Sequence, residues 1–316
     1  MKKLLVVRDD RLGDLMLILP ALRLIKSSMR DIQIDCLVNK NYSDISLISN
    51  DIKNTLHDDG ALIEMINKKN YDFSISFFST LNIAYKLWRT NIRKRYAPAT
   101  KSAQFFYNKK IIQKRSESKK AEYEYNLDLA SFFLNDNKCK NKIENSPYIN
   151  LTTEEVTKSN SENIIYIHPF TGGSSKTLSS TDFITLCKEL QSLSNCTFVI
   201  HCDENDYEKC KKMESQAPEL NINTITPTKD IKEMFININK CDLFIAGSTG
   251  PLHVAAALNK KTVGFYPTKK SSNILRWDTI NNDDFKLSFN DEGDDNLYIK
   301  VNLKKIALLI KNKLLS

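Results

Sequence analysis

The turn GSTG at residues 247–250 is the part of this sequence best suited to hold an anion. It follows an apolar run at 243–246, and Pro251 and His253 stand at the start of the helix-forming segment that comes next. Glycine lets a backbone approach a ligand closely, proline suits the first turn of a helix, and free N–H groups at a helix amino end bind anions. The pattern predicts a phosphate or diphosphate site, with an ordinary βαβ crossover and a structural histidine as the alternative.

Asp14 is a candidate general base. It closes the turn DDRLGD, residues 9–14, after a β-rich run at 3–8 and before a segment with helical spacing. A carboxylate at this position could take the proton from a hydroxyl that attacks an electrophilic carbon. An aspartate at the start of a helix is also a common cap or dipole partner, and Asp9 and Asp10 are nearby alternatives for the base. The residues alone leave both roles open.

A second glycine turn carries a cation. The segment HPFTGGSSK, residues 168–176, places Lys176 shortly after two adjacent glycines. A lysine and helix N–H groups can compensate the charge of a leaving nucleoside diphosphate without a metal, whereas an exposed loop lysine is the alternative. After the β-rich run at 197–200, Glu204 or Asp206 could hold ribose hydroxyls, although acidic residues are expected at a helix start.

Alternating strands and helices must position these residues. In the first half we expect strands at 3–8, 32–38, 55–57 and 73–77 and helices at 14–28, 42–49, 60–68, 80–88 and 122–134, with a kink or late start at Pro20. In the second half we expect strands at 163–167, 197–200, 221–225, 243–246 and 262–265 and helices at 181–193, 207–215, 231–240, 253–258 and 303–315. The alternation predicts an α/β protein with two Rossmann-like domains, 1–150 and 151–316, a polar linker at 135–162, mostly parallel sheets, and ligands in a cleft at the strand carboxyl ends.

A basic segment with interspersed aromatic residues, 89–120, interrupts the alternation in the first half. Such a segment can bind single-stranded nucleic acid, form a loop that meets an anionic lipid acceptor, or be a solvated surface. Its members are Arg89, Arg93, Lys94, Arg95, Lys101, Lys109, Lys110, Lys114 and Arg115 with Tyr96, Phe105, Phe106 and Tyr107.

The composition is that of a globular protein with a basic surface. The chain has 316 residues, 41% hydrophobic and 27% charged, with a formal charge of +8. This charge suits a partner that carries phosphates or carboxylates, although it is also consistent with genome composition. We find no signal peptide and no run of the ~20 apolar residues that a membrane span needs, so we expect a cytoplasmic protein. The seven scattered cysteines are expected to be reduced thiols, mostly buried.

Three segments together resemble the signature regions of glycosyltransferase family 9, the lipopolysaccharide heptosyltransferases. They are RDDRLGDLMLILPALRLIK (8–26), HPFTGGSSKTLSSTDF (168–183) and CDLFIAGSTGPLHVAAALNKKTVGFYPT (241–268). The resemblance implies a GT-B arrangement, in which two Rossmann-like domains face each other across a cleft. It also implies inverting transfer, without metal or cofactor, of heptose from ADP-heptose to the inner core of lipopolysaccharide or lipooligosaccharide.

The resemblance implies specific roles. Asp14 matches the family's general base, Lys176 its phosphate-binding lysine and His253 the histidine near the diphosphate and sugar. The full donor-binding set that we expect in domain 151–316 is Thr171, Ser174, Lys176, Glu204, Ser248, Thr249, Gly250, Pro251, Leu252 and His253. The acceptor-binding set that we expect in domain 1–150 is Asp10, Arg11, Gly13, Arg93 and Arg95. The partners implied are an anionic glycolipid of the lipid A–Kdo type and the cytoplasmic face of the bacterial inner membrane, with no nucleic acid and no metal.

Two departures from the family pattern bear on the donor sugar. Ser248 replaces the usual aspartate before Thr-Gly, and Thr-Leu-Ser at 177–179 stands where Trp-Pro is common. Loss of a carboxylate that binds sugar hydroxyls changes which sugar is favoured, so these departures bear on the donor sugar and not on the reaction class. The alternatives are a hydrolysing nucleotide-sugar epimerase of GT-B fold and, in a different class, a nucleic-acid-binding protein. A dinucleotide oxidoreductase is disfavoured because residues 9–14 contain no GxGxxG.

Overall fold

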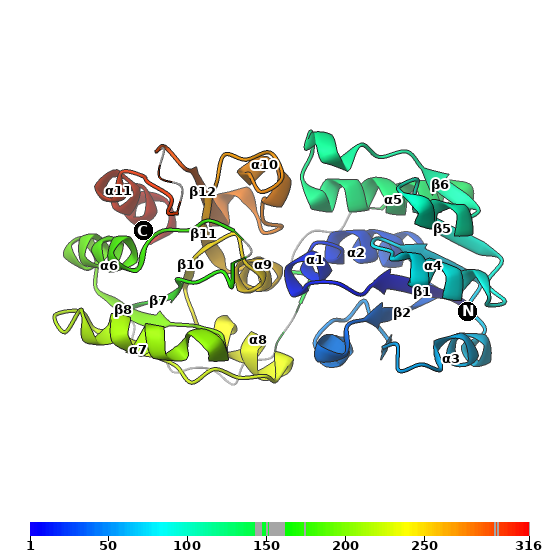
Figure 1. The fold of residues 1–316 in the computed structure, drawn as a ribbon, viewed down its shortest axis with the longest axis horizontal. Helices are drawn as coiled ribbons and strands as arrows, with labels where there is room; N and C mark the ends of the chain where they lie inside the picture. The colour runs from blue at the N-terminus through cyan, green and yellow to red at the C-terminus, as the bar shows by residue number, and fades with distance from the viewer. Residues whose placement is uncertain are drawn as a thin grey trace. The chain divides into compact units, whose positions relative to one another are not determined.

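The computed structural model describes residues 1–142, 147–149, 151, 162–173, 175–293, 295 and 297–315. The chain divides into two compact units, Met1–Asn150 and Leu151–Ser316. Each unit is an α/β fold built on a six-stranded sheet (Figure 1). We call them unit 1 and unit 2.

The sheet of unit 1 has the strand order β3-β2-β1-β4-β5-β6, and every pair of neighbouring strands is parallel. Its strands are β1 (Lys2–Arg8), β2 (Ile32–Val38), β3 (Asn54–Leu56), β4 (Phe73–Ser76), β5 (Lys94–Pro98) and β6 (Lys109–Ile111). The apolar run of β1 is buried because β2 and β4 flank it within the sheet and helices cover both faces of the sheet. The chain moves outward from β1 to β3, then returns to β4 beside β1. This reversal between β1 and β4 is where a doubly wound sheet opens a crevice at its strand carboxyl ends.

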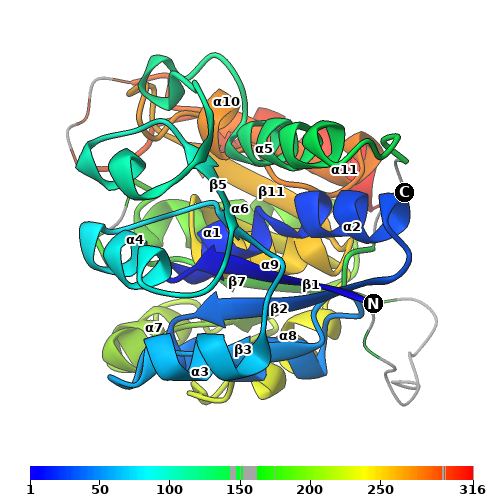
Figure 2. The ribbon, with the colours of Figure 1, turned by 90° about the vertical axis from the view of Figure 1, so that its right-hand side faces the viewer.

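The helices of unit 1 cover both faces of this sheet. They are α1 (Leu12–Met16), α2 (Leu19–Ser28), α3 (Leu62–Lys69), α4 (Leu81–Trp88) and α5 (Glu122–Asp136), with 3₁₀ helices η1 (Lys40–Leu47), η2 (Ser102–Phe106) and η3 (Arg115–Glu117). Helices α2 and α5 pack together on one face, and α3 and α4 lie on the other (Figure 2). Pro20 stands in the first turn of α2, so the expected late start is confirmed and α1 is a separate short helix.

The sheet of unit 2 has the order β12-β11-β10-β7-β8-β9 and is also parallel throughout. Its strands are β7 (Asn163–His168), β8 (Cys196–Ile200), β9 (Ile222–Thr224), β10 (Leu243–Gly247), β11 (Lys261–Tyr266) and β12 (Lys286–Asn290). Here the reversal lies between β7 and β10. The crevice of this sheet is therefore expected beyond the carboxyl ends of those two strands.

The helices of unit 2 are α6 (Ser180–Leu193), α7 (Tyr207–Ser215), α8 (Ile231–Asn239), α9 (Gly250–Ala257), α10 (Ile274–Trp277) and α11 (Leu303–Leu314), with η4 (Glu204–Asp206) and η5 (Asp283–Phe285). Helices α6 and α11 pack against each other, and α8 packs against α9. A capping box between Ser179 and Asp182 fixes the start of α6. Residues 251–257 of α9 are all buried, which ties the helix firmly to the sheet.

Several elements differ from the sequence prediction. The segment expected as a helix at 42–49 is the 3₁₀ helix η1, with a kink at Tyr42. The basic segment 89–120, for which no strand was predicted, supplies β5 and β6, and β12 and α10 were not predicted either. These strands have three to five residues, carry lysines and lie at or near sheet edges, so the apolar pattern that marks a buried strand is absent.

Candidate functional site

A buried arginine organises the acidic turn of unit 1. Arg8 ends β1, has only 3% of its side chain exposed, and forms ion pairs with Asp14 and with Asp10, where Nε lies 2.8 Å from Oδ1. Its Nη1 also donates to the carbonyl oxygen of Phe77, directly after β4, over 3.4 Å. The two carboxylates therefore stand at the carboxyl ends of β1 and β4, where the sheet reverses its direction.

Burial gives these carboxyl groups unusual acidity. It raises the pKa of Asp10 to about 7, although the Arg8 charge acts against this and Asp14 adds to it. Burial also raises the pKa of Asp14, with the charge of Glu122 adding to the effect and Arg8 opposing it. A carboxylate with a raised pKa holds a proton more firmly, so it is a better general base near neutral pH. Asp9, the other alternative, has its pKa raised by burial and by Asp58.

The side chain of Asp14 does not cap its helix. The N-cap of α1 is Arg11, which makes no side-chain cap bond, and the Asp14 carboxylate pairs with Arg8 instead. The other end of α1 is held from a distant element, because Nδ2 of the buried Asn126 on α5 donates to the Leu17 carbonyl over 3.0 Å. Asp14 thus sits on a five-residue helix fixed at both ends.

The remaining residues predicted to contact an acceptor lie in two places. Gly13 is buried in α1 and Arg11 is exposed beside it, whereas Arg93 is exposed just before β5. Arg95 donates to the carbonyl oxygens of Phe106 over 3.0 Å and Ile92 over 2.6 Å, so it holds its own loop together. The structure brings Asp10, Arg11 and Gly13 together with Asp14, while the contribution of Arg93 and Arg95 to an acceptor site stays a prediction.

The amino end of α9 in unit 2 is left open by its own residues. Thr249 is the N-cap, but its hydroxyl makes no cap bond and is buried with no hydrogen-bond partner. Pro251 occupies the first turn and has no N–H to satisfy. Capping threonines normally accept from an N–H of the first turn, so here those donors remain available to a ligand.

His253 adds a neutral side chain to this helix start. Its ring is buried, its Nδ1 has no partner, and burial lowers its pKa to about 4. The imidazole is therefore uncharged at neutral pH. Buried polar atoms without partners are uncommon in folded proteins, and two of them at one helix start are consistent with a ligand that completes their hydrogen bonds.

Lys176 lies on the loop that follows β7. Gly172 and Gly173 adopt the positive φ values of 56° and 78° in this loop, and the Thr171 hydroxyl donates to the Ser175 carbonyl over 2.6 Å. These contacts give the loop a defined turn. Ser174, predicted to bind the donor, lies outside the described residues.

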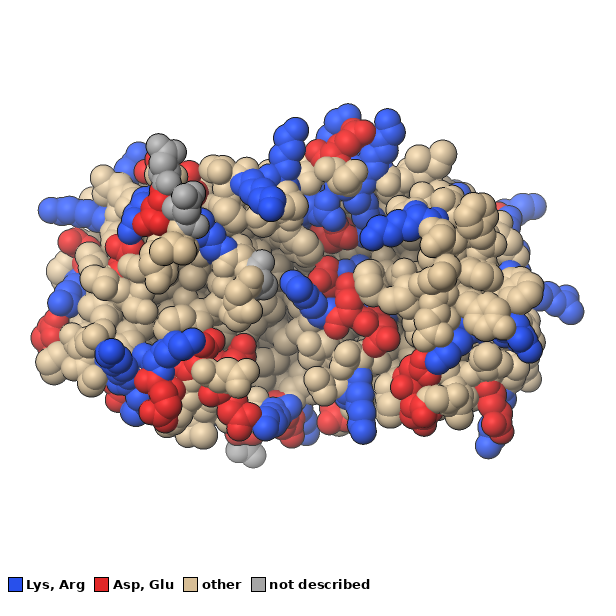
Figure 3. Space-filling view, in the orientation of Figure 1, with Lys and Arg blue, Asp and Glu red and all other residues tan. Residues whose placement is uncertain are grey.

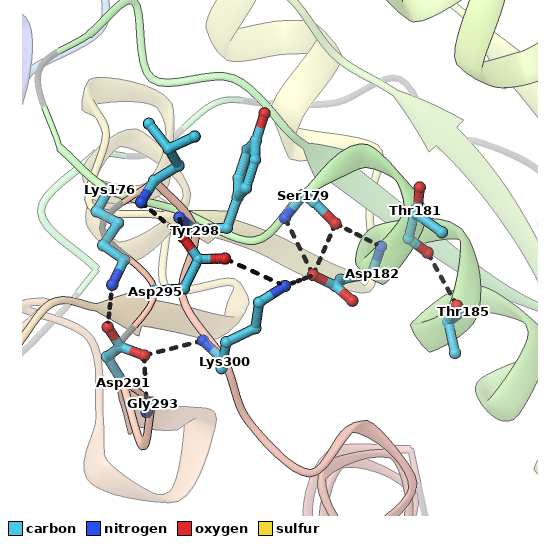
Figure 4. Close-up of polar contacts among 11 residues, drawn as sticks. Lys176, Ser179, Thr181, Asp182, Thr185, Asp291, Gly293, Asp295, Tyr298 and Lys300 are labelled. Carbon is cyan, nitrogen blue, oxygen red and sulfur yellow. Dashed lines mark hydrogen bonds and ion pairs between the residues drawn. The ribbon is translucent and has the colours of Figure 1, made fainter.

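An aspartate far along the chain anchors Lys176. The ammonium group pairs with the buried Asp291, which follows β12 (Figure 4). Oδ1 of Asp291 accepts from the N–H groups of Lys300 over 2.9 Å and Gly293 over 3.2 Å. Burial opposes ionisation of Asp291, but these bonds and Lys176 outweigh it and lower the pKa of the carboxyl group. The negative charge at Asp291 is therefore stable and fixes the lysine.

The Lys176 loop and the start of α9 meet at the end of β10. A Cβ atom added to Gly247 would lie 2.7 Å from Oγ1 of Thr177 and 3.3 Å from Cγ2 of Thr171. The absence of a side chain at Gly247 is thus what lets the loop pack against β10. Oγ1 of Thr177 is a further buried hydroxyl without a partner.

The other predicted residues of unit 2 lie around this point or apart from it. Ser248, Gly250 and Leu252 belong to the same turn and helix start as Thr249. Glu204 lies on η4, exposed and 2.7 Å from the ammonium group of Lys229, and so its ribose contact stays a prediction.

Sequence reasoning missed four polar residues. Arg8 and Asp291 hold the predicted base and the predicted phosphate lysine, and His168 and His201 form a buried pair at the ends of β7 and β8. Their Nδ1 atoms are 3.1 Å apart, and burial lowers the pKa of both rings, that of His201 to about 3. The sequence offered one signal for Arg8, which is a charged residue at the end of an apolar strand run. It offered no signal for Asp291.

Among the described residues, no group of three or more His, Cys, Asp or Glu side chains could hold a metal ion. None of the described helices combines the length and apolar character that a membrane-spanning segment needs. All seven cysteines are free thiols and all but Cys139 are buried, as expected.

Comparisons with known proteins agree with this geometry. The family model for glycosyltransferase family 9 (heptosyltransferase) matches residues 60–299. A Haemophilus influenzae protein assigned as a glycosyltransferase is 32% identical over 338 aligned residues, which cover 99% of this chain and 98% of the relative. Among solved structures, the E. coli heptosyltransferase WaaC with ADP has a TM-score of 0.77 at 15% identity, covering 98% of this chain and 99% of the other. A family 9 glycosyltransferase from Veillonella parvula has a TM-score of 0.80 at 14% identity, covering 99% and 97%. These structures share the GT-B fold with this chain.

Proposed function

Because this chain belongs to glycosyltransferase family 9, we propose that it transfers heptose from ADP-heptose to the inner core of a lipopolysaccharide or lipooligosaccharide, with inversion and without a metal. That the chain is a glycosyltransferase follows from the family itself. The donor nucleotide is inferred in part from the fold shared with the E. coli enzyme solved with ADP. Features of the two sites support the rest of the proposal, which concerns the sugar, the acceptor and the roles of individual residues.

The observation that carries the proposal is the open amino end of α9 beside the Lys176 loop. Helix N–H groups, the lysine ammonium and the unpartnered hydroxyls of Thr177 and Thr249 form a set of donors suited to the oxygens of a diphosphate. When the sugar leaves its nucleotide, negative charge grows on the diphosphate, and fixed donors of this kind stabilise that charge. Unit 2 is therefore assigned as the donor-binding unit.

Unit 1 supplies the base in this proposal. An acceptor hydroxyl attacks the anomeric carbon as its proton passes to the Asp14 carboxylate, and the bond between that carbon and the phosphate oxygen breaks, releasing ADP. Attack from the face opposite the leaving group inverts the anomeric carbon. The raised pKa of Asp14 favours uptake of the proton, and its pairing with Arg8 keeps the carboxylate in one orientation.

Ser248 bears on the sugar. It begins the turn before α9, where a carboxylate would accept hydrogen bonds from sugar hydroxyls, and a serine supplies a single neutral hydroxyl instead. We retain heptose as the donor sugar and infer a site that is less selective among sugars than one built with aspartate. The acceptor in this proposal is an anionic glycolipid of the lipid A–Kdo type, which the enzyme meets as a peripheral protein on the cytoplasmic face of the inner membrane. The formal charge of +8 favours that location.

Calorimetric titration of the purified chain tests the donor. ADP is expected to bind more tightly than UDP, GDP or CMP, equally with and without Mg²⁺. A preference for UDP or GDP would reassign the nucleotide, and no nucleotide binding at all would refute the donor site.

The Asp14→Ala variant tests the base. Turnover is expected to fall by about 10²-fold or more, the usual contribution of a general base, while ADP binding stays at the wild-type level. Near-normal turnover would remove Asp14 from the mechanism, and a loss confined to Asp10→Ala would assign the base to Asp10.

A further inference from the structure

Unit 1 carries an apolar surface that the transfer reaction does not use. Leu81, Tyr85 and Trp88 are spaced by four and three residues along α4, so they share one face of the helix. Leu81 is 53% exposed and Trp88 50%, and Phe105 on η2 is 79% exposed. Phe106 joins the two elements, because its ring centroid lies 5.8 Å from that of Tyr85 and 6.0 Å from that of Trp88. We call these five residues the α4–η2 patch.

The chain around the patch is strongly basic. Residues 81–116 contain ten lysines and arginines and no aspartate or glutamate. Arg89 lies on the patch itself, since its guanidinium donates to the Tyr85 hydroxyl over 3.0 Å, and Lys101 is exposed at the start of η2. Lys86 is paired with Asp58. In Figure 3, uncharged side chains cover much of the area where Figure 1 draws α4, and Lys and Arg side chains stand at its margin together with some Asp and Glu side chains.

We propose that the α4–η2 patch docks on an anionic lipid bilayer, with Leu81, Trp88 and Phe105 entering the boundary between headgroups and acyl chains. Tryptophan and tyrosine favour that boundary because one part of each side chain is apolar and another forms hydrogen bonds. Exposed apolar residues together with lysine and arginine are the combination that binds anionic membranes at their surface.

The structure favours a bilayer over single-stranded nucleic acid. Bases bind by stacking on open aromatic faces, but Tyr85, Trp88 and Phe106 already pack against one another. The patch also includes an exposed aliphatic side chain, Leu81, which suits acyl chains better than bases. The basic side chains of Arg89 and Lys101 at the patch are complementary to anionic phospholipid headgroups.

The patch reaches toward the candidate base. Phe78 lies between β4 and α4, is partly exposed, and its ring centroid is 5.8 Å from the guanidinium carbon of Arg8, which pairs with Asp14. A bilayer seated on the patch would thus place lipid headgroups near the carboxylate that the acceptor hydroxyl must reach. This last step rests on the proposed function, whereas the docking itself does not.

Vesicle flotation tests the docking. The chain is expected to float with vesicles of phosphatidylcholine and phosphatidylglycerol, and much less with phosphatidylcholine alone. Phe105→Ser and Trp88→Ala should each weaken binding by about tenfold, the effect of removing one aromatic side chain from an apolar environment. Leu308→Ala with Leu309→Ala, which removes two exposed apolar residues from α11 of unit 2, is the matched control and should float as the wild type does.

Fluorescence gives a second readout that is insensitive to folding defects in the patch variants. The chain has two tryptophans, so Trp277→Phe leaves Trp88 as the sole indole. Its emission should shift to the blue with anionic vesicles and be quenched by brominated lipid.

No flotation, unchanged flotation of Phe105→Ser and Trp88→Ala, or binding of a single-stranded oligonucleotide in place of vesicles would overturn the proposal. ADP titration of the same proteins separates the membrane docking from the proposed donor site. A protein that binds ADP but does not float with anionic vesicles refutes the docking alone. A protein that floats but does not bind ADP refutes the donor site alone.

Discussion

Replacing Arg8 by methionine should move the pH dependence of the reaction without removing the base. Methionine keeps much of the apolar length of the side chain but removes the positive charge that pairs with Asp10 and Asp14. That charge lowers the pKa of both carboxyl groups and opposes the effect of their burial. Without it, both pKa values rise, and the base is protonated over a wider range of pH.

The size of the effect follows from the contact. An opposite charge within hydrogen-bonding distance typically lowers a carboxyl pKa by about 1 to 3. The acid limb of the profile of kcat/KM against pH should therefore move upward by ~1–3 pH units in Arg8→Met. Because a base must be unprotonated to act, the rate at a fixed pH on that limb falls by about 10- to 10³-fold and recovers as the pH is raised.

The assay is kcat/KM for sugar transfer, measured across the pH range in wild type and variant. Arg23→Met is the matched control, since Arg23 is a largely buried arginine of the same unit that pairs with Asp51 over 2.7 Å, away from Asp14. It should lose stability without moving the acid limb. A folded Arg8→Met protein whose acid limb stays in place would refute the role of Arg8 and, with it, the assignment of these carboxylates as the base.

Other substitutions test the donor unit. Lys176→Ala should weaken ADP binding by about 10- to 10²-fold, the loss of a hydrogen bond to a charged group, and unchanged affinity by calorimetry would contradict the phosphate role. Ser248→Asp should change the ratio of kcat/KM between ADP-heptose and ADP-glucose, and an unchanged ratio would show that this position does not select the sugar. The free energy of unfolding should fall as the pH drops from 6.5 toward 3, because folded His201 and His253 have pKa values of about 3 and 4 and the unfolded state binds more protons. In urea titrations at pH 7 and pH 5, His201→Gln should show a smaller drop than the wild type, and an equal drop would exclude this histidine as a source.

The βα alternation could be predicted from the sequence because each strand and helix is marked by a local pattern of apolar residues. Apolar runs such as β2 and β10 are long enough to be recognised, and Pro20 marks the start of α2. The short strands β5 and β6 could not be recognised because of their lysines, since a strand at or next to the edge of a sheet needs few apolar residues. Local pattern is thus informative for elements that are buried on both faces and weak for those at an edge.

The same limit applies to the residues of the candidate sites, because some are marked by local sequence and others are brought together only by the fold. The glycine turns, Lys176 and Asp14 could be named as candidates because helix starts and glycine turns are contiguous in sequence. The partner of Lys176 was not, because Asp291 is 115 positions away and meets it only through the order of the strands in unit 2. Arg8 is close to Asp14 in sequence, but its burial follows from the pairing of β1 with β2 and β4.

The contact between Asn126 and Leu17 has a consequence for how the acidic turn of unit 1 forms during synthesis. A helix of five residues is far below the ~12–15 at which an isolated helix becomes even marginally stable in water, so α1 depends on contacts with the rest of the unit. One of those contacts spans 109 positions of sequence. On the ribosome, the turn that carries Asp14 emerges well before α5, and it gains this support only after α5 has left the exit tunnel. The nascent chain therefore carries Asp14, the proposed general base, long before it can hold that carboxylate in place.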